Sequence, residues 1–94
     1  MRLLTREVLS DNGFKSDWPD RSITKFVKAD PEYEIEVAYT YGFTTHSMIA
    51  VATCKKLDKK THVVTKEARV SPVETVDELQ MALKLCGINI YIED

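Results

Sequence analysis

The stretch YEIEVAY, residues 33–39, limits the possible folds most, because apolar and polar residues alternate through it without a break. In a strand, the two faces would hold Tyr33, Ile35, Val37 and Tyr39 on one side and Glu34, Glu36 and Ala38 on the other. This pattern is typical of an antiparallel strand with one buried and one solvated face. A fold built on such a strand needs other elements to cover its apolar face.

Two segments with helix-capping signals are expected to supply that cover. In LLTREVLSDNGF, residues 3–14, Thr5 is placed as an N-cap and Gly13 as a left-handed stop. Leu4 and Leu9 occupy the two positions of a hydrophobic staple, and Phe14 is placed to pack back on Leu9. The sequence therefore predicts a short N-terminal helix.

The segment VETVDELQMALKLCGI, residues 73–88, predicts the second helix. Thr75 and Glu78 form a capping box, while Gly87 ends the helix and Ile88 can contact Leu83. Its expected core stripe consists of Val76, Leu79, Leu83 and Cys86, widened by Met81, Ala82 and Leu85.

Further strands are expected over residues 46–55 and 61–70, with a weaker one over 22–28 and a turn at Gly42. The alternating INIYI, 88–92, would add a short final strand, whereas KSDWPDRS, 15–22, has the composition of a loop. We predict a single α+β domain, residues 1–94. It has an N-terminal helix, an antiparallel meander of three to four strands, a C-terminal helix packed on one sheet face and an optional last strand.

Composition excludes little beyond long disorder and a membrane span. Of 94 residues, 44% are hydrophobic and 30% charged, and the net charge of −2 gives no overall attraction to nucleic acid or anionic membranes. The start, MRLLTREVL, has too short an apolar run for a signal peptide, and two cysteines make no disulfide framework. We expect free thiols and a cytoplasmic location, without a membrane.

The sequence CKKLDKKTH, 54–62, is nearly symmetric about Asp58 and raises the question of a thiol–imidazole pair. A three-residue hairpin loop would set Cys54 opposite His62, and the nearby lysines would lower the pKa of the thiol. A four-residue loop, 57–60, would set Cys54 opposite Val63 instead, and it needs no glycine. We favour this second register and predict no catalytic residue.

The face pattern favours the same register. It would gather Ile49 and Val51 with Val64, Ala68 and Val70 on the buried face. The other face would hold Ala50, Ala52 and Cys54 with Thr65, Glu67 and Arg69.

Three groups are candidate binding residues. Lys55, Lys56, Lys59 and Lys60 could contact phosphates, although a solvated hairpin tip fits the negative net charge better. Tyr41 and Phe43 could stack on bases, although continuing the apolar row of the strand is the simpler interpretation. Trp18 is either an exposed contact or, as we favour, an anchor that folds a loop onto the core.

Metal, cofactor and carboxylate sites are poorly supported. His46, His62, Cys54 and Cys86 lack metal-site spacing, and neither a phosphate-binding glycine loop nor a GxSxG elbow is present. Glu34 and Glu36 point to a solvated face, paired with Lys55 or its neighbours. We expect neither a metal nor a cofactor.

The two capped segments, LLTREVLSDNGF and ETVDELQMALKLCGI, resemble those of a group of small proteins of Bacteroides and their phages that have no established activity. In that group a short helix ending in Gly-Phe, a β-meander and a late helix follow one another. The resemblance implies the same fold and no chemistry.

These observations favour a small non-enzymatic interaction protein that acts through protein–protein contacts. Its partner would be an unidentified protein or a second copy paired through an edge strand. The alternative is a weak nucleic-acid-binding module that uses the lysine-rich hairpin, residues 55–60.

Overall fold

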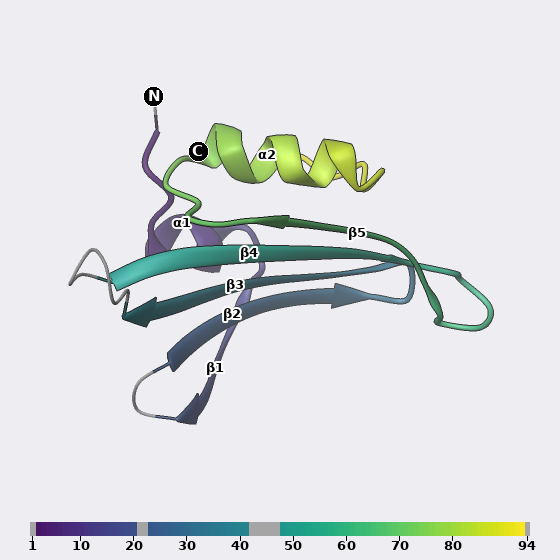
Figure 1. The fold of residues 1–94 in the computed structure, drawn as a ribbon, viewed down its shortest axis with the longest axis horizontal. Coiled ribbons are helices and arrows are strands. Elements are labelled where there is room, and N and C mark those ends of the chain that lie inside the picture. Colours follow the sequence, from purple (N-terminus) through teal and green to yellow (C-terminus); the bar gives the residue numbers. More distant parts are fainter. Residues whose placement is uncertain (1, 21–22, 42–47, 94) are drawn as a thin grey trace.

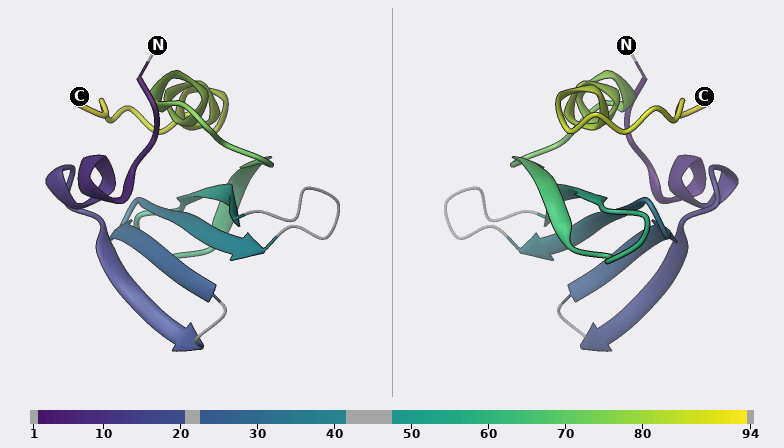
Figure 2. Two further views of the ribbon diagram at one scale, coloured as in Figure 1. Left: turned by 90° about the vertical axis from the view of Figure 1, so that its left-hand side faces the viewer. Right: turned by 90° about the vertical axis from the view of Figure 1, so that its right-hand side faces the viewer.

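The computed structural model describes residues 2–20, 23–41 and 48–93. Its elements are α1 (Arg6–Asp11), β1 (Lys15–Asp20), β2 (Ile23–Asp30), β3 (Tyr33–Tyr41), β4 (Met48–Leu57), β5 (Val64–Val70) and α2 (Val76–Leu85). Within these residues the strands form a five-stranded antiparallel sheet in the order β1-β2-β3-β4-β5 (Figure 1). Both helices lie on the same side of this sheet (Figure 2). The α+β prediction is confirmed.

Two details of the predicted architecture are wrong. Among the described residues the sheet has five strands instead of three to four, because residues 15–20, predicted as loop, pair with β2 as the edge strand β1. The short final strand is not formed: residues 88–93 continue from α2 without joining the sheet. The turn expected at Gly42 lies outside the described residues.

Both helices begin and end as their capping signals predict. Thr5 Oγ1 accepts a hydrogen bond from Val8 N at 3.2 Å, and Phe14 N donates to Leu9 O at 3.0 Å beyond Gly13, whose φ is +85°. In α2, Thr75 Oγ1 accepts from Glu78 N at 3.1 Å. Ile88 N closes the other end by donating to Leu83 O at 2.9 Å.

The β4–β5 hairpin differs in register from both alternatives. Cys54 lies opposite Ala68, because the turn runs from Asp58 to Val63 and a register shift follows between Lys56 and Leu57. Asp58 organises this longer turn: its Oδ1 accepts from Lys60 N and Thr61 N, both at 2.9 Å. These bonds, that of Thr61 first, lower the pKa of the Asp58 carboxyl.

The predicted division of faces on β4 is also wrong. Ala50, Ala52 and Cys54 are buried on the helix-covered face, whereas Ile49, Val51 and Thr53 are only half-buried on the other. Small side chains under a helix let it approach the sheet closely, which explains the inversion. Because α2 contacts β4 and β5, it occupies the space that large β4 residues would fill.

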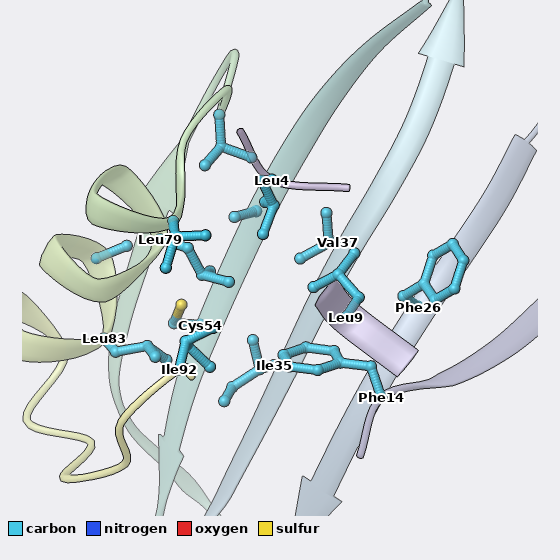
Figure 3. Close-up of a cluster of buried hydrophobic side chains, with 14 of the residues drawn as sticks. Leu4, Leu9, Phe14, Phe26, Ile35, Val37, Cys54, Leu79, Leu83 and Ile92 are labelled. Atoms are coloured by element: carbon cyan, nitrogen blue, oxygen red, sulfur yellow. The ribbon is translucent and has the colours of Figure 1, made fainter. Parts of the chain in front are cut away.

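The core lies between this helix-covered face and the two helices (Figure 3). Its members are Leu4, Val8, Leu9, Phe14, Phe26, Ile35, Val37, Ala50, Ala52, Cys54, Val73, Val76, Leu79, Ala82, Leu83, Cys86, Ile88 and Ile92. The last two belong to the segment after α2, which Gln80 holds: its Nε2 donates to Ile90 O and its Oε1 accepts from Ile92 N, both at 2.8 Å.

Candidate functional site

Cys54 and His62 do not meet. Cys54 is fully buried on the helix-covered face of β4, where Cys86 Sγ donates to its carbonyl at 3.4 Å. Burial, with a smaller contribution from Cys86, raises the pKa of the Cys54 thiol to about 12. His62 is exposed in the turn at φ +60°, a backbone region that favours glycine. The thiol therefore stays protonated at neutral pH, and the His62 imidazole is not beside it.

The four lysines of the hairpin do not form one basic surface. Lys55 lies on the helix-free face between Glu34 and Glu67, its neighbours on β3 and β5. Lys56 points to the opposite face, towards Gly87. At the tip, Lys59 Nζ lies 3.6 Å from Glu32 Oε1, and the Lys60 side chain is exposed. The four lysines therefore point in different directions, and two of them lie beside acidic side chains. They do not form the single phosphate-binding surface that the sequence allowed.

The predicted aromatic sites are placed only by their backbone. Trp18 belongs to β1, so the expected loop anchor lies in an edge strand. Tyr41 ends β3, and Phe43 and His46 lie outside the described residues. Tyr39, also in β3, packs edge-on against Phe26 with ring centroids 5.9 Å apart.

The outer side of β5 carries backbone groups with no strand partner among the described residues, because β5 ends the sheet. Backbone groups point alternately to the two neighbours along an antiparallel strand. Leu57 N donates to Glu32 O on the β3 side, and Ala50 O accepts from Val73 N on the other. By alternation, the even-numbered residues of β4 bond to their β5 partners at 66, 68 and 70. Glu67 and Arg69 therefore direct their N–H and C=O groups outward.

Apolar side chains of α2 lie beside this open edge. Met81 and Leu85 are 59% and 61% exposed, and they follow one another by one helical turn. Met81 lines a hollow of about 280 Å³ together with Val70 of β5 and the acidic residues Asp77 and Glu78. We call the outward backbone of Glu67 and Arg69, with Val70, Met81 and Leu85, the β5 edge site.

Sequence reasoning missed this site because it placed Met81 and Leu85 in the core stripe, and that prediction is wrong. Ala82, predicted with them, is buried. The signal was nevertheless present, since Met81 and Leu85 are four residues apart on one flank of the helix, beside the stripe that Leu79 and Leu83 define.

The chain matches no protein-family model, no curated protein and no solved structure in comparisons with each. Within the described ranges, no three acidic, histidine or cysteine side chains converge as metal ligands. In the same part of the chain, neither helix has the length and apolar character needed to cross a membrane.

Proposed function

We propose that the protein acts by binding another protein chain at the β5 edge site. The observation that carries this proposal is the coincidence of an unpaired strand edge with exposed apolar side chains on the helix beside it. An extended segment added to β5 would bond to the outward groups of Glu67 and Arg69. The side chains of this segment on the helix-covered face would contact Val70, Met81 and Leu85. The added strand would therefore gain apolar burial as well as backbone hydrogen bonds.

The thiols support an interaction role without a covalent step. Both Cys54 and Cys86 are free and buried, and the raised pKa of Cys54 keeps its thiol neutral. Buried free thiols are also typical of a reducing compartment, which supports a cytoplasmic setting for the proposed interaction.

The test compares capture of proteins from a cell extract by three immobilised forms. Met81→Asp/Leu85→Asp places charge on the β5 edge site, and Tyr91→Asp makes the same change at a residue that is 77% exposed on the segment after α2. Because an apolar contact loses affinity when a carboxylate is buried in it, we expect bound proteins to fall at least tenfold with the double variant only. Quantitative mass spectrometry measures the amounts.

Equal capture of other proteins, together with equal self-association of wild type and the double variant, would contradict the proposal. Capture that disappears with nuclease treatment or added salt would instead favour the nucleic-acid-binding module on residues 55–60.

A further inference from the structure

We infer that the β5 edge site binds a second copy of this chain, with the two β5 strands antiparallel about a two-fold axis at Ala68. The inference rests on the proposed function and adds the occupant and its register. A two-fold axis through the sheet keeps all four helices on one side and forms a continuous ten-stranded sheet. Such an interface is isologous, so every contact occurs twice.

The charges on the helix-free face select the register. The N–H and C=O groups of Glu67 and Arg69 point outward. With the two-fold axis at residue 67, 68 or 69, these groups would face outward-pointing groups of the second copy, so all three registers allow backbone hydrogen bonds. An axis at Glu67 sets that carboxylate against its own copy, and an axis at Arg69 does the same with two guanidinium groups. The axis at Ala68 alone sets Glu67 opposite Arg69 of the second copy, twice per dimer. Opposite charges facing across strands stabilise the pairing, and like charges weaken it.

The helix-covered face fits the same register independently. An axis at Ala68 places Lys66 of the second copy directly opposite Val70. Val70 lines the hollow beside α2 that Asp77 and Glu78 also border. The Lys66 side chain is exposed in the single chain. In the dimer its methylene groups would lie on Val70, and its ammonium group would approach the two carboxylates.

The apolar residues of α2 complete the contact. Because α2 packs over β4 and β5, the α2 helices of two paired copies lie next to each other above the two β5 strands. The flanks that face each other carry Met81 and Leu85, so dimerisation buries the apolar surface that the single chain exposes. Ala68 at the axis adds no bulk that would keep the strands apart.

The test uses two charge reversals, each of which should weaken dimerisation alone, while a mixture of the two variants should restore it. In E67R, the introduced guanidinium group would face Arg69 of the other copy, and in R69E two carboxylates would face each other. In an equimolar mixture, every facing pair between an E67R chain and an R69E chain has opposite charges. The matched control is E34R, because Glu34 also neighbours Lys55 on the helix-free face but lies in β3, away from the edge.

Sedimentation equilibrium over a range of concentrations gives the dissociation constants. We expect a wild-type dimer, about tenfold or greater weakening in each single reversal, near wild-type association in the mixture, and no change in E34R. Circular dichroism checks that each variant is folded.

A wild-type chain that stays monomeric at several hundred micromolar overturns the inference. If capture of another protein still depends on Met81 and Leu85, the proposed function stands without it. If neither self-association nor capture occurs, both are wrong. A dimer that the reversals do not weaken, or that the mixture does not restore, shows that the axis is not at Ala68.

Discussion

The two edges of the sheet are built differently. At β1, Pro19 has no N–H to offer a neighbouring strand, and the register with β2 shifts between Asp17 and Asp20. At β5, residues 66–70 pair with β4 without interruption. Prolines and bulges are common means of preventing strand addition, so β1 is protected in a way that β5 is not.

The charged side chains of β5 are a weaker barrier to strand addition than their number suggests. Its side chains include Lys66, Glu67 and Arg69, and lysine at an edge usually opposes aggregation. Here both signs occur within four residues, so a uniformly charged strand would set a like charge against at least one of them, whereas a strand with the same sequence can set opposite charges together. The two edges therefore differ in what opposes strand addition: a proline and a register shift at β1, and only the pattern of charges at β5.

The largest loss of stability is expected from removing the buried Leu79 side chain, which packs α2 on the sheet. Leu79 is fully buried and faces the sheet (Figure 3). Leu79→Ala should lower the free energy of unfolding by about 2 to 5 kcal/mol, because the cavity adds to the lost apolar burial. Urea denaturation of the protein at low concentration, where any dimer is dissociated, measures this change.

Leu85→Ala is the matched control, since Leu85 is on the same helix but 61% exposed. Its effect on the free energy of unfolding should stay within about 0.5 kcal/mol. A large loss of stability in Leu85→Ala would show that its side chain belongs to the core and is not available to a partner.

Proline substitutions distinguish the two sides of β5. Ala68→Pro removes an N–H that points to β4 and leaves the Cys54 carbonyl without that partner, which should cost about 2 to 3 kcal/mol. Glu67→Pro removes only an outward N–H, so the free energy of unfolding should fall by less than about 1 kcal/mol. Chemical denaturation of both variants gives the two values.

Glu67→Pro should nevertheless weaken strand addition, because it makes the edge of β5 resemble that of β1. A Glu67→Pro chain that is as unstable as Ala68→Pro would mean that Glu67 points to β4, and the β5 edge site would lose its backbone donors.

The elements predicted well from the sequence are those with local causes. Thr5, Gly13, Thr75 and Gly87 fix the helix ends through capping bonds that involve near neighbours in the chain. Alternation over residues 33–39 likewise predicts which side chains face the helices, because the strand period does not depend on distant contacts.

The elements predicted poorly depend on partners far away in the chain. Residues 15–20 are mostly polar and include a proline, yet they form β1 because an edge strand needs only one neighbour. The hairpin register could not be read from loop preferences, because His62 adopts the left-handed conformation that glycine usually supplies. For the β5 edge site, the sequence predicted pairing through an edge strand without saying which strand. It could not show that Met81 and Leu85 lie beside the edge of β5.

A smaller effect than that of Ala68→Pro is expected in the segment after α2, where a side chain satisfies backbone groups of the kind that the edge of β5 leaves open. Residues 88–92 alternate like a strand, but Gln80 takes the place of a neighbouring strand by pairing with Ile90 O and Ile92 N. Gln80→Ala should lower the free energy of unfolding by about 1 to 2 kcal/mol, since two hydrogen bonds are lost. It should also speed hydrogen exchange at the Ile92 amide. Asn89→Ala, an exposed change in the same segment, should do neither; unchanged exchange in Gln80→Ala would mean that apolar packing alone holds this segment in place.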